Sequence, residues 1–281
     1  MSKYGTRLAP NTLIFKDPTV NCGHSKNPFD KDLAPQDFFA SAAARELEVR
    51  LNYLLELHGI GLITGDVGCG KTSICRKVVS VLHAGIWRVC YVPNSTGSVM
   101  DLYKSIAWEL GLRTERNRAG LYRAIRDEVT RLCRESRISP LLIVDEAQHL
   151  RADVIEDLRL LTNYDMDSKN HLCLILIGQT ELRRRLSLSV HEALAQRIVV
   201  CHHLAALGRE EVPLYLSHLL RLAGTELPLF EPPALEALFQ ATSGLPRKLN
   251  LLAHHALNAA ALSRAKSVAA DHVQAAMPEL C

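Results

Sequence analysis

The sequence predicts an α/β fold, in which a parallel sheet flanked by helices is followed by a small all-helical domain. Between residues 36 and 206, short apolar runs alternate with amphipathic helical patterns. The runs are apolar at nearly every position, as in strands that are buried on both faces of a parallel sheet. After residue 206 no strand-like run remains, and four helical patterns follow, separated by glycines and prolines.

Three segments are expected along the chain. Residues 1–35 are polar and rich in Asn, Lys, Asp and Pro, which predicts an irregular N-terminal arm with Asn27-Pro28-Phe29 as an anchor. The α/β domain then covers 36–206, and the helical domain covers 207–281. The expected strands are 60–64, 87–92, 141–144, 172–177 and 198–201, and the expected helices are 36–58, 72–84, 98–110, 121–137, 153–162, 181–188, 191–196, 209–223, 233–241, 246–263 and 269–276.

A glycine-rich loop follows the first expected strand. Residues 65–72 fit the phosphate-binding pattern G-x-x-x-x-G-K-T, also called Walker A. Glycines let backbone N–H groups turn toward phosphate oxygens, and the helix that begins here directs its N-terminal dipole at the same anion. The residues expected to bind the nucleotide are Gly65, Asp66, Val67, Gly68, Cys69, Gly70, Lys71, Thr72 and Ser73.

Two residues of this loop have specific chemical roles. Lys71 supplies a positive charge to the β and γ phosphates, and the hydroxyl of Thr72 is a ligand for Mg²⁺. The alternative is a chance match in a glycine-bearing turn. The strand before the loop and the amphipathic helix after it favour phosphate binding, so the expected cofactors are ATP and Mg²⁺.

Two acids, in the arrangement called Walker B, end the most apolar run of the sequence. Residues 141–144 read Leu-Leu-Ile-Val and are followed by Asp145 and Glu146. Carboxylates after a buried strand are costly unless they meet a cation or take part in a reaction. We expect Asp145 to hold Mg²⁺, directly or through water, and Glu146 to be the general base that activates the attacking water. An acidic helix cap is the alternative.

Further polar residues are candidates for the reaction. Gln179 follows the apolar run 172–177 and could orient the attacking water, with Thr180 as the alternative and a simple turn as the competing interpretation. Arg197 precedes the last expected strand and could reach the γ-phosphate of a neighbouring subunit as an arginine finger, although an ordinary solvated arginine is the alternative. The other candidates for the finger are Arg183, Arg184 and Arg185.

Arg247 is a candidate catalytic residue of the helical domain. It follows Gly244, Leu245 and Pro246, and a proline suits the first turn of a helix. Arg247 is therefore expected near a helix N-terminus, where the helix dipole disfavours a cation. An anionic partner such as the γ-phosphate of ATP would explain its presence there.

The overall composition limits the cellular compartments and partners that fit this protein. The formal net charge of +3 permits a polyanionic partner without requiring one. No apolar run reaches the ~18 residues that span a bilayer, and no signal peptide is visible. None of the eight cysteines forms a C-x-x-C pair, which is typical of free thiols in a reducing compartment. We therefore expect a cytoplasmic protein.

With these elements in order, the sequence resembles AAA+ ATPases over nearly its whole length. Gln179 and the segment 244–247, with the helical domain as a lid, narrow the resemblance to this class. Within the class, the sequence is most similar to the ExeA (general secretion pathway protein A) type. The segments that carry this similarity are Asn27-Pro28-Phe29, Gly65 to Thr72, Asp145-Glu146-Ala147-Gln148, Leu158-Arg159-Leu160-Leu161-Thr162-Asn163 and Ile177-Gly178-Gln179-Thr180-Glu181-Leu182.

The resemblance implies an ATP hydrolase that forms oligomers in one of two settings. One is the assembly of a secretion or envelope complex, where the ATPase is followed by a membrane segment and a peptidoglycan-binding region. The other is DNA transposition, where stand-alone TniB-, TnsC- and IstB-like ATPases form rings or filaments on duplex DNA, select the target and recruit the transposase. The sequence stops at Cys281 without an envelope-spanning part, which favours transposition. A third possibility is an ATPase used as a binding platform, with little turnover.

The same resemblance suggests DNA contacts. In the DNA-binding relatives, the segments after the second strand face the DNA, and contacts to its phosphates would be sequence-independent and salt-dependent. A solvated helical face, balanced by Glu115, Asp127 and Glu128, is the alternative. ATP is expected to hold subunits together on DNA, and slow hydrolysis to release them. The candidate contacts are Ser95, Thr96, Lys104, Arg113, Thr114, Arg116 and Arg118.

Overall fold

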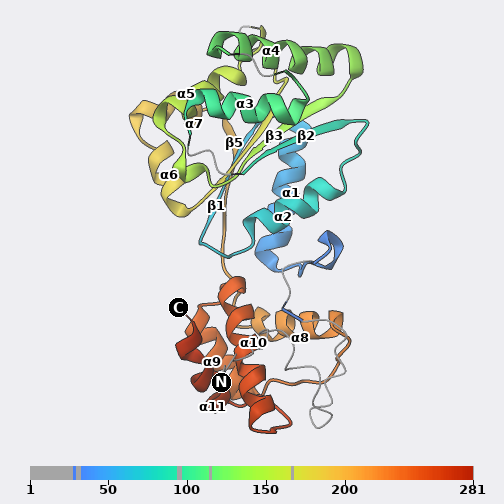
Figure 1. The fold of residues 1–281 in the computed structure, drawn as a ribbon, viewed down its shortest axis with the longest axis vertical. Coiled ribbons are helices and arrows are strands. Elements are labelled where there is room, and N and C mark those ends of the chain that lie inside the picture. Colours follow the sequence, from blue (N-terminus) through green and yellow to red (C-terminus); the bar gives the residue numbers. More distant parts are fainter. Residues whose placement is uncertain (1–27, 30–32, 94–96, 114–115, 166–167, 281) are drawn as a thin grey trace, which may run out of the picture. The chain divides into compact units, whose positions relative to one another are not determined.

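The computed structural model describes residues 28–29, 33–93, 97–113, 116–165 and 168–280. These residues form two compact units, which are described separately. One unit is Ala42–Ala205, and the other combines the described residues up to Ser41 with those from Ala206 onward (Figure 1). Within the described part of the chain, no helix is both long and apolar enough to cross a membrane.

The first unit is built on a five-stranded sheet with the order β2-β3-β4-β1-β5. Every neighbouring pair is parallel, which confirms the predicted sheet. Because the strands are parallel, their carboxyl ends meet at one edge, where the candidate site residues follow β1, β3 and β4. The strands are β1 (Ile60–Gly65), β2 (Trp87–Val92), β3 (Ser139–Val144), β4 (Cys173–Gly178) and β5 (Ile198–Leu204).

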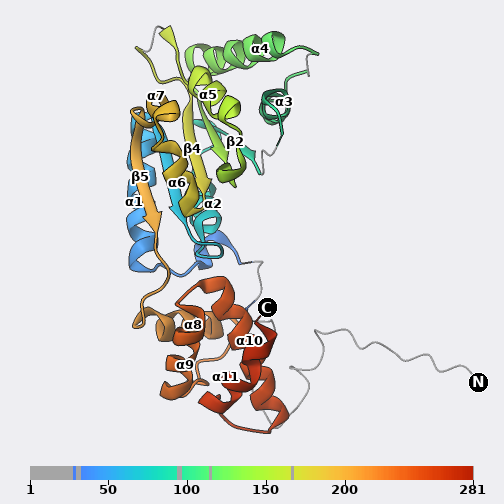
Figure 2. The same ribbon diagram turned by 90° about the vertical axis from the view of Figure 1, so that its left-hand side faces the viewer.

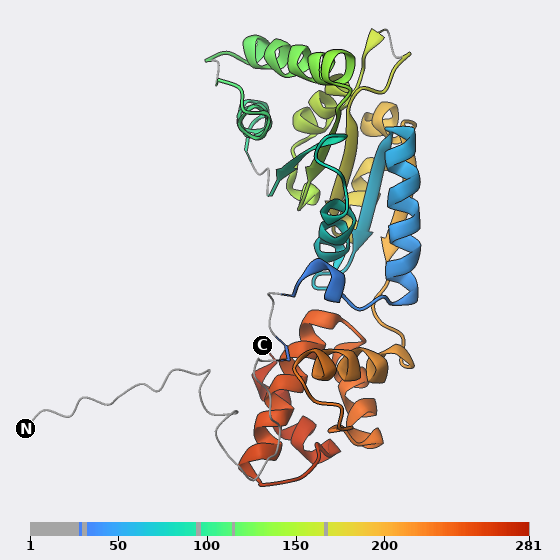
Figure 3. The ribbon, with the colours of Figure 1, turned by 90° about the vertical axis from the view of Figure 1, so that its right-hand side faces the viewer.

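Helices cover both faces of this sheet. In Figure 3, α1 lies on one side of the sheet, and α3 and α4 lie on the other. Figure 2 shows β5 as an edge strand, beside α1. The helices are α1 (Ala42–Leu57), α2 (Lys71–Ser80), α3 (Val99–Leu110), α4 (Arg118–Arg131), α5 (Ala152–Leu161), α6 (Thr180–Leu186) and α7 (Glu192–Ala195).

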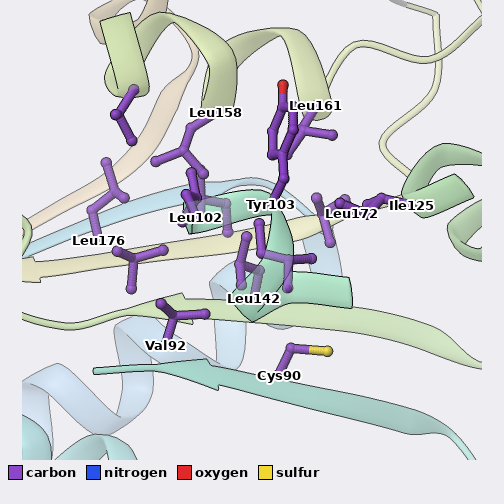
Figure 4. Packing of buried hydrophobic residues seen from close by; sticks show 14 of the residues in the cluster. Cys90, Val92, Leu102, Tyr103, Ile125, Leu142, Leu158, Leu161, Leu172 and Leu176 are labelled. Atoms are coloured by element: carbon purple, nitrogen blue, oxygen red, sulfur yellow. The ribbon is translucent and has the colours of Figure 1, made fainter. Parts of the chain in front are cut away.

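The largest apolar core lies between the sheet and the helices α3, α4 and α5. Leu102 and Tyr103 of α3 and Leu158 of α5 pack over Leu142 and Leu176 of the sheet (Figure 4). All five side chains are buried. Burial of a large apolar side chain contributes roughly 1.5–3 kcal/mol, so this layer holds β3 and β4, and the residues that follow them, in a fixed place.

Local signals explain where α3 and α4 begin. Ser98 caps α3 by accepting the N–H of Asp101, whose carboxylate accepts the N–H of Ser98 in return. The structure starts α4 at Arg118, three residues before the expected start at Leu121, because the side chain of Asn117 accepts the N–H of Gly120 at 2.6 Å. Asparagine is a common cap, and it marks this helix start.

The second unit is the predicted helical domain with one addition. Its helices are α8 (Glu211–Leu222), α9 (Pro232–Thr242), α10 (Pro246–Leu262) and α11 (Ala270–Ala276). Phe29 is buried in the core of these helices, and Leu33 packs against it. The ring of Phe39 meets the ring of Tyr215 edge-on at 5.5 Å, and His218 bonds to the main-chain oxygen of Asp37 at 2.7 Å.

These contacts move the domain boundary. The structure divides the chain after Ser41, whereas the sequence predicts a division at 35/36, because Asp37 and Phe39 pack on the helical unit. The second division falls after Ala205, next to the predicted 206/207. Most of the expected arm 1–35, including Asn27 of the anchor motif, lies outside the described residues, whereas Phe29 is buried.

Candidate active site

The glycine-rich loop connects β1 to α2, as the sequence predicts. Gly68 and Gly70 have φ values of 83° and 99°, which L side chains rarely adopt. Gly65 is required for a different reason, because a Cβ atom there would lie 2.7 Å from the main-chain oxygen of Leu204. A Cβ atom on Gly70 would meet nothing within 4 Å, so the space beside this end of α2 is open.

Lys71 is buried and folded back onto its own loop. Its Nζ donates to the main-chain oxygens of Gly65 at 2.9 Å and Asp66 at 2.8 Å. Among the described residues, no carboxylate forms an ion pair with it. A buried ammonium that meets only neutral acceptors is well placed to exchange them for an anion. Cys69 lies beside this ammonium, and burial raises the pKa of its thiol.

Thr72 and Asp145 meet at the edge of the sheet. The Thr72 hydroxyl donates to Oδ2 of Asp145 at 2.7 Å, although the two residues are 73 positions apart. Asp145 is 5% exposed, and its other oxygen, Oδ1, accepts the N–H of Glu146 at 2.8 Å. The structure therefore brings together the two residues that the sequence assigns to Mg²⁺.

Tyr91 is a site residue that the sequence analysis missed. Its hydroxyl donates to the same Oδ2 of Asp145 at 3.0 Å. Burial, and then the negative charge of Asp145, raise the pKa of Tyr91, so the hydroxyl stays protonated and remains a donor. Tyr91 lies next to the end of β2, and β2 pairs with β3. The sequence signal that could have indicated Tyr91 is a polar residue at the end of an apolar strand.

Glu146 follows Asp145 with an unusual backbone. Its φ is 52°, in the left-handed region, and its side chain is exposed. Such a conformation costs of order 1 kcal/mol or more for a residue with a Cβ atom, and it is common at functional sites. Oε2 of the carboxylate accepts the side-chain amide of Gln148 at 2.6 Å. In the sequence, Gln148 stands out only as part of the motif Asp145-Glu146-Ala147-Gln148.

Gln179 follows β4, the strand that lies between β1 and β3. This order places the residue at the same edge as the glycine-rich loop and Asp145. Gln179 occupies the N-cap position of α6, and its main-chain N–H donates to Oε1 of Gln148 at 3.1 Å. Thr180, the alternative, begins the helix.

Arg197 lies at the opposite end of the strands from the glycine-rich loop, where β1 and β5 begin. It immediately precedes β5, whose first residue pairs with Ile60 at the beginning of β1. Its guanidinium donates to the main-chain oxygen of Arg159 and the hydroxyl of Thr162, both at 3.2 Å. Burial lowers the pKa of Arg197. The residue caps the C-terminal end of α5, where a cation is favoured, and its role as a finger stays a prediction.

The other candidate arginines differ in their surroundings. Arg183 and Arg184 are exposed on α6, whereas the guanidinium of Arg185 donates to the main-chain oxygens of Gln148 and Leu150. Arg247 lies in the first turn of α10, as predicted, and is exposed within the helical unit.

The candidate DNA contacts fall into three groups. Arg118 donates from two guanidinium nitrogens, Nε and Nη2, to the buried carboxylate of Asp157, and this pair connects α4 to α5. This bond gives Arg118 a structural role that the sequence did not indicate. Lys104, Arg113 and Arg116 are exposed, and within the described chain they form no ion pair. Ser95, Thr96 and Thr114 lie outside the described residues.

Loss of the Arg118 side chain is expected to lower stability. Arg118→Met leaves the 3%-exposed Asp157 without its cation, which should cost about 1–3 kcal/mol of unfolding free energy, since an unsatisfied buried group costs that much. Urea denaturation measures the change. The matched variant Arg116→Met should stay within about 0.5 kcal/mol of the wild type, as is usual for surface positions. Equal stabilities of the two variants would contradict the structural role of Arg118.

The site residues fit ATP and Mg²⁺. Gly68 and Gly70 have positive φ, and the space beside Gly70 at the N-terminus of the ten-residue helix α2 is open, which suits a phosphate group. Lys71 supplies an ammonium without an acidic partner among the described residues. Thr72 and Asp145 supply the hard oxygen donors that Mg²⁺ prefers.

The fold and this site define the chain as an ATPase of the AAA+ class. Residues 55–186 match the family model described as an AAA domain, and the chain belongs to the AAA domain ATPases. Over 242 residues it is 37% identical to general secretion pathway protein A of Aeromonas hydrophila, a match that covers 85% of this chain and 44% of that protein. The chain thus spans less than half the length of this relative.

Two further similarities are weaker. The ATP-dependent target DNA activator B of Escherichia phage Mu is 29% identical over 145 residues, which are 51% of this chain and 42% of that protein. The crystal structure of Cdc6p from Pyrobaculum aerophilum superimposes with a TM-score of 0.70, covering 90% of this chain and 70% of that one. Its sequence identity is 18%, so this likeness concerns the fold alone.

Proposed function

We propose that the chain hydrolyses ATP at the edge of the sheet where β1, β3 and β4 end. The observation that carries the proposal is the contact between the Thr72 hydroxyl and the buried Asp145, 2.7 Å apart. Two oxygen donors from distant parts of the chain meet beside a loop that is shaped for phosphate, which is the donor set of a magnesium nucleotide site.

Each residue then has a defined role. When bound, Mg²⁺-ATP supplies the phosphoryl group and a metal that neutralises charge on it. The loop N–H groups and Lys71 hold the phosphates, and Thr72 and Asp145 hold the metal. Glu146 accepts a proton from the attacking water, and Gln179 orients that water. The arginine finger would act in the site of a neighbouring copy, and the candidates are Arg183, Arg184 and Arg197. Arg247 would contribute its charge from the helical unit.

We further propose that the ATPase works as a homo-oligomer in the assembly of a secretion or envelope complex. The support is the similarity to general secretion pathway protein A, which covers 85% of this chain at 37% identity. The similarity to the phage target DNA activator covers 51% at 29% identity. The expectation that favoured transposition therefore becomes the second candidate.

A specific observation keeps DNA transposition as that second candidate. Lys104, Arg113 and Arg116 are exposed and form no ion pair within the described residues, so they are available to phosphates. In this setting, the oligomer would form on duplex DNA with ATP and recruit a transposase and target-selection proteins. Three cations are a small number for a DNA-binding surface, and the phage relative matches only half of the chain, so transposition ranks second.

The two settings are separated by DNA retention. The protein is incubated with Mg²⁺ and either ATP or ADP on immobilised duplex DNA of arbitrary sequence, over a salt series. Under the secretion proposal, ATP should produce no retention even at low salt. Retention that requires ATP and weakens steeply with salt, as phosphate contacts do, would overturn that proposal in favour of transposition. Phosphate release from Mg²⁺-ATP tests the ATPase activity itself. If no phosphate is released at any protein concentration, the proposal of ATP hydrolysis, which both settings share, is overturned.

A further inference from the structure

Gln148 is a buried amide beside the proposed general base. It lies in the short 3₁₀ helix η3 (Ala147–His149), which follows β3 and precedes α5. The residue is 7% exposed, and a buried amide is costly unless its polar atoms find partners. The roles proposed for Glu146 and Gln179 do not account for it.

Both polar atoms of this amide are satisfied, by two different parts of the site. Nε2 donates to Oε2 of Glu146 at 2.6 Å, and Oε1 accepts the main-chain N–H of Gln179 at 3.1 Å. The partners fix which atom is which, because a main-chain N–H can only donate and a carboxylate can only accept. Gln148 therefore connects the Glu146 carboxylate to the end of β4.

The surroundings hold the amide in this place. A Cβ atom on Gly178, the last residue of β4, would lie 2.9 Å from Oε1 of Gln148, so a side chain there would displace the amide. From α6, the guanidinium of Arg185 donates to the main-chain oxygens of Gln148 and Leu150. The side chain and the backbone of Gln148 are thus both tied to the segment that follows β4.

We propose that Gln148 is a positioning residue for ATP hydrolysis: it holds one oxygen of the Glu146 carboxylate and sets its place relative to the end of β4. Because Oε2 is occupied by the amide, Oε1 is the oxygen of Glu146 that is left to accept a proton from the water. The inference rests on the proposed function, since it requires that Glu146 is the general base.

The first test replaces the amide with an apolar side chain of similar length. Gln148→Met is expected to lower kcat for ATP about 10- to 100-fold, because a small misplacement of a reacting group can cost that much. KM and the affinity for ATP should not change, since the hydrogen bonds of Gln148 among the described residues go to Glu146, Gln179 and Arg185 and not to the glycine-rich loop. The matched control is Gln240→Met, which removes an exposed amide-to-carboxylate bond of 2.8 Å on α9.

Two further variants test whether Gln148 acts through Glu146. Gln148→Glu keeps an acceptor for the N–H of Gln179 but replaces the donor to Glu146 with a second carboxylate, so kcat should fall at least as far as in Gln148→Met, and the unfolding temperature should also fall because the two carboxylates repel each other. In the Glu146→Gln background, Gln148→Met should cause no further loss, because a residue that acts through Glu146 has nothing left to position.

The outcomes distinguish this inference from the proposed function. If the wild type hydrolyses ATP but Gln148→Met and Gln148→Glu turn over at its rate, the inference fails and the ATPase proposal stands. If the losses from Gln148→Met and Glu146→Gln multiply in the double variant, Gln148 acts elsewhere and the inference also fails. A wild type without hydrolysis refutes both.

Discussion

Glu146→Gln is expected to reduce ATP turnover about 10²- to 10⁴-fold, the range of a lost general base, and to leave ATP binding intact. The amide cannot accept the proton of the attacking water, whereas its size and its bond to Gln148 are preserved. The residues that hold the phosphates and the metal are unchanged. Phosphate release measures turnover, and titration with a fluorescent ATP analogue measures binding.

The control for this variant is Glu181→Gln. Glu181 is an exposed carboxylate in the first turn of α6, at the same edge of the sheet. Its replacement changes the net charge equally and should leave turnover unchanged. Normal hydrolysis by Glu146→Gln would show that another group activates the water.

Lys71→Met is expected to weaken ATP binding by about 10- to 100-fold. Hydrogen bonds to charged groups contribute about 1.5–3 kcal/mol, and each 1.4 kcal/mol is a factor of ten in affinity. Methionine keeps the apolar stem of the side chain but not the ammonium, which now donates to the oxygens of Gly65 and Asp66. Equilibrium titration with the same ATP analogue gives the dissociation constant.

Lys77→Met is the matched control, on the same helix. Its Nζ pairs with the carboxylate of Glu48 at 2.6 Å, so the variant loses a cation and an ion pair without touching the glycine-rich loop. Its affinity for ATP should equal that of the wild type. If both variants bind ATP as the wild type does, Lys71 is not a phosphate ligand.

The sheet and the centre of the site were predictable because their signals are local. A strand that is buried on both faces is apolar throughout, and the glycines of the loop lie within eight residues of one another. Asp145 and Glu146 end a strand of the same kind. Two acids at the end of such a strand have few other uses, so their chemistry could be inferred before their position was known.

Tyr91, Gln148 and Arg118 could not be assigned from the sequence because their roles depend on partners far along the chain. Tyr91 meets Asp145 only because β2 pairs with β3. Arg118 looked like the exposed cations near it, and only the fold places the carboxylate of Asp157 within reach. An arginine that binds a buried acid and one that faces solvent have the same local pattern.

The contact of Phe29 and Phe39 with the helical unit has a consequence for synthesis on the ribosome. The chain emerges from its N-terminus, so these aromatic rings leave the ribosome long before Tyr215 and the rest of their binding surface exist. The sheet unit, Ala42–Ala205, is continuous and can fold as soon as it is complete. The helical unit combines residues from before and after the sheet unit, and its core therefore forms only after the sheet unit has been synthesised.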